Sequence, residues 1–213
     1  MSKSISLVLA SLLIFAHVPA ADAFVFDAWH SGMNISRVVA AGKERGIVVE
    51  FSDGGFSLFS KKEPEELAVN IEYHGATKLM GYDSKLVFIF APESRVLHTI
   101  RVFLSLPLSS DKADMEVLAD TLAKQLDAKY KQTGEPVAAS LLGQLADTVR
   151  QIQRRSWKGN GDTISMESNW KMIGGDVVIT YVDDKIAGRA VVEDHRIREK
   201  MLERSSGSDR NKF

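Results

Sequence analysis

The chain of 213 residues contains no cysteine. It therefore has no disulfide, no thiolate nucleophile, no cysteine-ligated zinc and no iron–sulfur cluster. Its charges almost cancel, with 27 basic and 28 acidic residues and a net charge of −1. A chain without an excess of positive charge has no electrostatic reason to bind nucleic acid, so we expect no nucleic-acid partner.

The sequence also lacks the common catalytic and cofactor motifs. It has no G-x-S-x-G turn for a serine nucleophile. The G-x-G at 159–161 lacks the third glycine of a dinucleotide-binding loop, and we interpret it as a hairpin turn. No two histidines after residue 23 have the spacing of a local metal-binding pair; they are His30, His74, His98 and His195. We predict no catalytic, cofactor or metal site from local patterns. A composite hydrolase site that includes His74, His98 and Asp183 stays open.

A long apolar run occurs only at the amino terminus. Residues 5–18 are largely apolar and follow Lys3, and residues 21–23 form a small-x-small site. This order is that of a secretory signal peptide, and a run of about 14 residues is shorter than the roughly 20 that a spanning helix needs. We expect cleavage after Ala23, a periplasmic chain that begins at Phe24, and no membrane span after cleavage.

About 190 residues follow this site, enough for one domain with its own core. In their first half, Asn34 and Gly46 are typical cap residues for a helix over 35–45. Alternating apolar residues and turn signals predict two hairpins, one of 47–51 with 56–59 and one of 85–91 with 96–104. Residues 61–66 are a charged loop, and the pattern of 67–73 leaves strand and helix open.

The second half starts with two amphipathic helices. Apolar residues at helical spacing predict helices over 111–131 and 136–154, joined by a short break as an antiparallel pair. Three strands then follow as a meander, at 155–158, 163–171 and 177–183. A charged helix over 186–203 and a polar, disordered tail over 205–213 complete the chain.

This order of elements predicts an α+β fold, in which the amphipathic helix pair packs on one face of antiparallel sheet. We expect a single domain over 24–204. A helix followed by strands is predicted twice along the chain. This order allows an internal duplication with sub-units 24–132 and 133–204, although the sequence shows no residue-level repeat.

Three short patterns occur in a fixed order in the first half. They are Trp29-x-x-Gly32-Met33 before a helix, Gly81-Tyr82, and Phe88-x-Phe90-x-Pro92-x-Ser94-x-x-Leu97. This set resembles a group of small exported bacterial proteins of unknown function, over 24 to about 131. The resemblance implies a periplasmic α+β protein and no activity. The Gly-Met helix start is more loosely similar to small periplasmic interaction domains of the outer-membrane assembly lipoprotein type.

Two local clusters are candidates for interaction with a partner. The first cluster is Trp29 with His30, and the start of a helix would also account for these residue types. The second is Arg154, Arg155 and Trp157, which are also typical of a solvated helix end. With an export signal and no catalytic motif, we expect a non-enzymatic binding module. Its partner would be an envelope protein, a peptide or a cell-wall component. The alternatives are the composite hydrolase and a structural homodimer.

Overall fold

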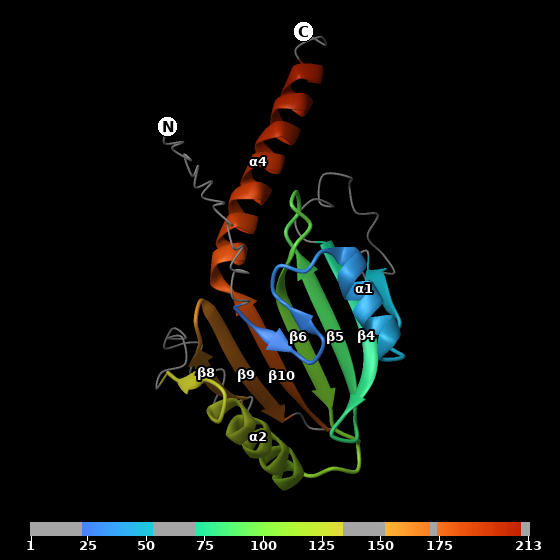
Figure 1. The fold of residues 1–213 in the computed structure, drawn as a ribbon, viewed down its shortest axis with the longest axis vertical. Coiled ribbons are helices and arrows are strands. Elements are labelled where there is room, and N and C mark those ends of the chain that lie inside the picture. Colours follow the sequence, from blue (N-terminus) through green and yellow to red (C-terminus); the bar gives the residue numbers. More distant parts are fainter. Residues whose placement is uncertain (1–22, 53–70, 134–151, 171–173, 210–213) are drawn as a thin grey trace, which may run out of the picture.

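The computed structural model describes residues 23–52, 71–133, 152–170 and 174–209, and the fold is α+β, as the sequence predicts (Figure 1). Eight antiparallel strands form one sheet in the order β3-β4-β5-β6-β10-β9-β8-β7. They are β3 (Val49–Ser52), β4 (Ile71–Leu79), β5 (Tyr82–Phe90), β6 (Leu97–Ser105), β7 (Lys131–Gln132), β8 (Ile152–Lys158), β9 (Asp162–Trp170) and β10 (Gly175–Asp183).

Three described helices accompany the sheet. Helices α1 (Ile35–Glu44) and α2 (Lys112–Asp127) pack on the same face, towards opposite edges, and α4 (Asp184–Asp209) projects beyond the end of the strands (Figure 1). A two-stranded hairpin of β1 (Val25–Phe26) and β2 (Trp29–His30) lies over the middle of that face. The centre of the sheet is therefore covered by a short hairpin instead of a helix.

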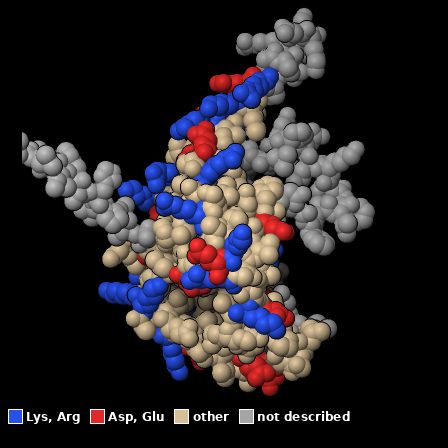
Figure 2. Space-filling model, turned by 45° about the vertical axis from the view of Figure 1, so that its right-hand side comes forward, with Lys and Arg blue, Asp and Glu red and all other residues tan. Residues whose placement is uncertain are grey.

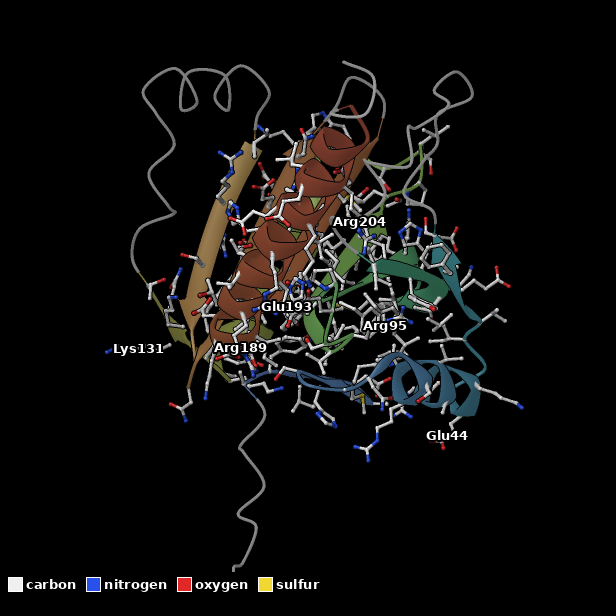
Figure 3. All side chains as sticks on the ribbon, turned by 90° about the horizontal axis from the view of Figure 1, so that it is seen from above. Glu44, Arg95, Lys131, Arg189, Glu193 and Arg204 are labelled. Carbon is white, nitrogen blue, oxygen red and sulfur yellow. The ribbon has the colours of Figure 1, made fainter. Side chains whose placement is uncertain are left out.

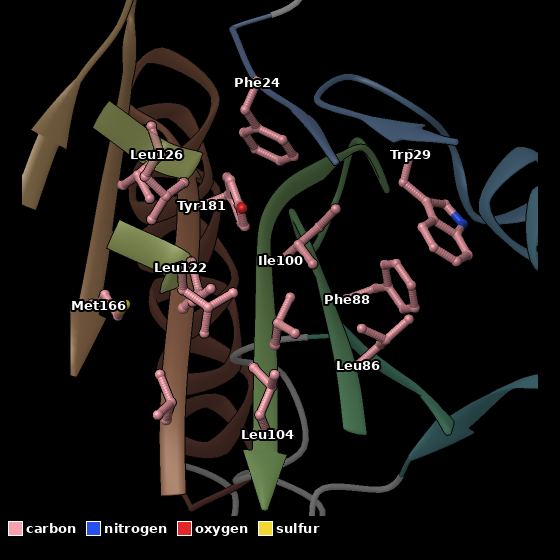
Figure 4. Close-up of a cluster of buried hydrophobic side chains, with 14 of the residues drawn as sticks. Phe24, Trp29, Leu86, Phe88, Ile100, Leu104, Leu122, Leu126, Met166 and Tyr181 are labelled. Carbon is pink, nitrogen blue, oxygen red and sulfur yellow. The ribbon is translucent and has the colours of Figure 1, made fainter. Parts of the chain in front are cut away.

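One row of cross-strand neighbours explains which face is covered. Since neighbours across strands point to the same side, these residues share one face: Phe51, Tyr73, Phe88, Ile100, Tyr181, Ile164 and Trp157. The hairpin of 85–91 with 96–104 is confirmed, as β5 paired with β6. Figure 4 shows the side chains of β5, β6 and β10 meeting those of α2 and the amino-terminal hairpin.

The first predicted hairpin is not tested by the described residues, which contain only its first strand, as β3. Residues 49–52 pair with β4, a strand that includes 71–73 of the undecided segment 67–73, and residues 56–59, 61–66 and 67–70 lie outside the described residues. The β4–β5 turn places Met80 and Gly81 at φ of 52° and 87°. A two-residue turn in which both residues have positive φ matches the right-handed twist of a hairpin. Met80-Gly81 was not predicted as such a turn from the sequence.

Helix α2 confirms the predicted helix after residue 111. The Asp111 side chain accepts from the Asp114 amide and the Asp114 side chain accepts from the Asp111 amide, a capping box. The helix ends at Asp127 and not at 131, because β7 begins at Lys131. The second helix of the predicted pair is wrong over 152–154, which belong to β8; its remaining part lies outside the described residues.

The predicted meander is confirmed as β8, β9 and β10. Helix α4 follows β10 directly, capped by Asp183, whose Oδ1 accepts from the Ile186 amide at 2.8 Å. It extends to Asp209, beyond the predicted end at 203, so the first part of the predicted disordered tail is helical. Both signs of charge alternate along α4, which gives it a solvated surface (Figure 2).

The two halves of the sheet meet where β6 pairs with β10, from Thr99 opposite Val182 to Ser105 opposite Asp176. From one edge to the centre the strands are β3, β4, β5 and β6, and from the other edge they are β7, β8, β9 and β10. In both halves the strands therefore follow chain order from the edge to the centre. Helix α2 packs on β8, β9 and β10. The geometry therefore groups α2 with the second half, although it precedes the predicted boundary at 132.

Candidate functional site

An open cavity of about 260 Å³ lies on the covered face, between α2 and the two central strands. Helices α1 and α2 sit towards opposite edges of the sheet with the amino-terminal hairpin between them (Figure 1), and residues of α2, the hairpin and the central strands line the cavity. Its walls are formed by Phe26, Leu79, Met80, Val102, Leu104, Leu122, Gln125, Leu126, Lys129, Tyr130, Ile179 and Tyr181. Of these twelve described residues, eight are apolar, two are the tyrosines Tyr130 and Tyr181, and the other two are Gln125 and Lys129.

The floor of the cavity comes from the centre of the sheet. Val102 and Leu104 of β6 lie beside Ile179 and Tyr181 of β10, and all four side chains are buried. Alternation along each strand sends these residues to the covered face. The strand pattern alone therefore produces an apolar floor.

Helix α2 forms one wall. Leu122 and Leu126 are one turn apart on the stripe that faces the sheet, together with the buried Met115 and Leu118. Figure 4 shows Leu122 and Leu126 on α2 opposite the side chains of the central strands. The apolar stripe was predicted from the sequence, and only its position over β10 makes it the wall of a cavity.

The amino-terminal hairpin closes the other side. Phe26 lies 5.4 Å from Tyr181 and 6.3 Å from Trp29 between ring centroids. Trp29 packs on Phe88, at 5.1 Å, and its indole N–H donates to the Val38 carbonyl at 3.0 Å. The tryptophan thus fixes the hairpin between α1 and the sheet, and the hairpin holds Phe26 at the cavity.

Three residues form a polar corner at the end of α2: Lys129, Tyr130 and Asp162. Lys129 Nζ donates to the Val25 carbonyl at 3.0 Å and lies 5.3 Å from the centre of the Tyr130 ring. The Tyr130 hydroxyl is buried without a hydrogen-bond partner, as are both carboxyl oxygens of Asp162. Buried polar atoms without partners are rare enough that each requires an explanation.

Burial has the largest effect on the pKa values of Asp162 and Tyr130. Desolvation raises the pKa of Asp162, and the neighbouring Asp184 and Asp183 raise it further, against the weaker opposing effects of its own backbone amide and of the Lys129 charge. Desolvation also raises the pKa of Tyr130, with a contribution from Asp162. Tyr181 has a raised pKa for the same reason, with Tyr130 as its neighbour. The phenols are therefore neutral hydrogen-bonding groups near neutral pH.

Trp29 and His30 occupy different environments. Trp29 is 1% exposed and belongs to the core, whereas His30 is partly exposed and its Nδ1 lies 2.9 Å from the Ser31 carbonyl. Asn34 caps α1 as predicted, accepting from the Arg37 amide at 3.0 Å. Trp29 contributes to the site by holding the hairpin, without lining the cavity itself.

Arg154, Arg155 and Trp157 lie in β8 and not at a helix end. Successive residues of a strand point to opposite faces, so the two arginines separate. Arg154 pairs with Glu167 at 2.8 Å, and Arg155 pairs with Asp120 of α2 at 2.5 Å. Trp157 is fully buried under α2, where its indole N–H donates to Asp127 at 2.7 Å. The structure does not bring these three side chains into one patch.

The residues of the composite hydrolase hypothesis come together only in part. His98 is 8% exposed, its Nδ1 lies 2.8 Å from Thr99 Oγ1, and its Nε2 is buried without a partner. Burial lowers its pKa, while Asp183 and Glu193 act in the opposite direction. His74 lies on β4 beside Glu72, at 3.3 Å, on the face of the sheet opposite to Phe88 and Ile100. His98 and Asp183 are therefore neighbours, and His74 is not part of their group.

Within the described parts of the chain, no group of three or more histidine or acidic side chains could hold a metal ion. Among the same residues, no helix has the length and hydropathy to cross a membrane. Comparison with protein-family models, with curated proteins and with solved structures found no match.

The cavity was not predicted from the sequence. Tyr130 was placed on the apolar stripe of its helix, and Lys129 was not singled out. The one available signal was the pair Met80-Gly81, whose left-handed turn brings Leu79 and Met80 to the rim. The remaining lining residues come from segments far apart in the sequence.

Proposed function

We propose that the protein is an exported, non-enzymatic binding module of the cell envelope, and that the central cavity binds the apolar part of an envelope component. The open cavity of about 260 Å³ is the observation that carries this proposal. Ligand pockets are concave, mostly apolar and equipped with a few polar groups, and this cavity has that composition.

The arrangement of the cavity supports a binding role in two further ways. Its walls come from the sheet, from α2 and from the amino-terminal hairpin, and the floor residues are buried in the main core. Sites built on such elements are held more precisely than sites on loops. The hairpin follows the predicted cleavage site within a few residues, so export and site formation involve the same part of the chain.

A neutral fluorescent probe tests this proposal without relying on charge. The purified chain is titrated with N-phenylnaphthylamine, whose fluorescence rises in apolar surroundings, and saturable binding is expected. Val102→Phe places a larger side chain in the cavity and should weaken probe binding by roughly tenfold or more, because a phenyl group occupies space that the probe needs.

Val178→Phe is the matched control. Val178 is next to Ile179 on β10 but pairs with Phe103, so its side chain lies on the opposite face of the sheet. This variant should bind the probe like the unchanged chain. Equal affinity of Val102→Phe and Val178→Phe, in proteins whose thermal unfolding shows that both are folded, would contradict the cavity as the binding site.

A further inference from the structure

Among the described residues that line the cavity, only Lys129 is charged. It is also a defined part of the site, since its Nζ donates to the Val25 carbonyl of the hairpin at 3.0 Å, while its backbone N–H, just after the end of α2, donates to the Leu126 carbonyl. The side chain therefore bridges the two structures that border the cavity. An ammonium group has three donors, so at least two remain for another acceptor.

In the part of the chain that the structure describes, no carboxylate forms an ion pair with this ammonium group. The contacts of Lys129 within the described residues are the Val25 carbonyl and the Tyr130 ring, and no acidic oxygen lies within ion-pair distance. Asp162 acts on it only from further away, and that carboxyl is 0% exposed beside the turn of β8 and β9. Lys129 is exposed, so its ammonium group at the rim of an apolar cavity is accessible to an anionic group of a ligand.

We propose that the cavity binds a single-chain fatty carboxylate, with the hydrocarbon chain on the apolar floor and the carboxylate at Lys129 Nζ. This inference rests on the proposed function, because it names the ligand of the same cavity. The volume of about 260 Å³ lies just below the range of roughly 300–1,000 Å³ that holds drug-sized ligands, which favours one chain over several.

The polar residues favour a carboxylate over a phosphate head group. One lysine matches a single negative charge, whereas phosphates carry more charge and are commonly bound by several cations or by the bidentate guanidinium of arginine. No arginine occurs among the described lining residues. Gln125 lines it and supplies neutral amide donors that suit a second carboxylate oxygen.

Three probes with the same chain separate these contributions: decanoate, decanol and decyl phosphate. Each is titrated into the purified chain by calorimetry at neutral pH. Decanoate is expected to bind roughly tenfold to a hundredfold more tightly than decanol, the usual difference for a charge-assisted hydrogen bond. Decyl phosphate is expected to bind more weakly than decanoate.

Lys129→Met keeps an unbranched apolar stem and removes the charge. It should abolish the preference for decanoate over decanol, so that the two probes bind with equal affinity. Lys124→Met is the matched control, because Lys124 is exposed on α2 and is not among the residues that line the cavity. This variant should keep the full preference.

The outcomes separate the two proposals. If decanol and decanoate bind equally, and Lys129→Met changes neither, the carboxylate inference is overturned and the apolar cavity remains the binding site. Tighter binding of decyl phosphate than of decanoate would also overturn it, in favour of a phosphate head group. If none of the three probes binds while N-phenylnaphthylamine does, the fatty chain itself is excluded. If no probe binds at all, the proposed function fails with the inference.

Discussion

The side chain of Asp162 packs directly on the Cα atom of Gly159, in the turn that joins β8 to β9. A Cβ atom at residue 159 would overlap the carboxyl group, and Asp162 is 0% exposed, so it has little room to move. The need for glycine here comes from this close approach, whereas at Gly161 it comes from a φ of 98° in open space.

Gly159→Ala should therefore lower the free energy of unfolding by about 1–3 kcal/mol, as overpacking of a filled site does. The double variant Gly159→Ala with Asp162→Ala removes the overlapping group and should recover part of that loss. Urea denaturation of the two variants and of Asp162→Ala measures the coupling. Additive effects of the two substitutions would contradict the proposed contact.

The raised pKa of Asp162 makes stability depend on pH. The folded chain holds the proton of this carboxyl at a higher pH than the unfolded chain does, so this group's contribution to stability is fully present below the unfolded pKa and is lost as pH rises through the folded one. Asp162→Asn has no such titration. Its free energy of unfolding should exceed that of the unchanged chain at pH 7, and the gap should narrow on acidification. Denaturant melts across this range test the sign, and a gap that widens in acid would be the opposite of what we expect.

At the scale of elements, one carboxylate holds α4 against the β5–β6 turn. Glu193 Oε2 accepts from the amides of Glu93 and Ser94 at 2.9 and 3.1 Å, and Arg196 pairs with the Glu93 side chain at 2.7 Å. Figure 3 shows Glu193 on α4 and Arg95 in that turn. Desolvation opposes ionisation of Glu193, but the hydrogen bonds from Ser94 and Glu93 and the Arg196 charge outweigh it and lower the pKa.

Glu193→Ala should release this contact. The amides of Glu93 and Ser94 are expected to exchange with solvent roughly fivefold faster, which corresponds to about 1 kcal/mol for a surface contact of this kind. Glu199→Ala is the control, since Glu199 is exposed on the same helix. Hydrogen exchange followed by mass spectrometry measures both variants. Unchanged exchange in Glu193→Ala would indicate that other contacts hold α4.

At the scale of the whole molecule, the two halves share one core across the β6–β10 ladder. Residues 24–132 alone would keep β6 but lose β10, so that the central strand becomes an open edge and Ile100, Val102 and Leu104 lose their neighbours. We expect this fragment not to unfold cooperatively when it is expressed by itself. Thermal melts followed by circular dichroism test this, and a sharp transition of the fragment would show that the first half is an independent domain.

Local patterns identified most of the fold. The cap residues Asn34 and Asp111, the stripe of α2 and the alternation in β5, β6 and β10 act within a few residues, and their elements are where the sequence predicts them. The errors occur where local patterns conflict with long-range pairing. Residues 152–154 continue an apolar helical spacing, but Ile152 pairs with Asn169 in the sheet. The helix α4 continues past Glu203 into residues whose composition is typical of disorder.

The sequence by itself determined the α+β class, the absence of thiol chemistry and most helix and strand positions, because composition and periodicity act locally along the chain. Only the tertiary structure decided the order of the strands, the separation of Arg154 from Arg155 and the burial of Trp157. It also decided the cavity, because the space between α2 and the hairpin depends on where two distant segments pack on the central strands. Lys129 becomes a candidate binding residue only through that packing, which no spacing in the sequence encodes.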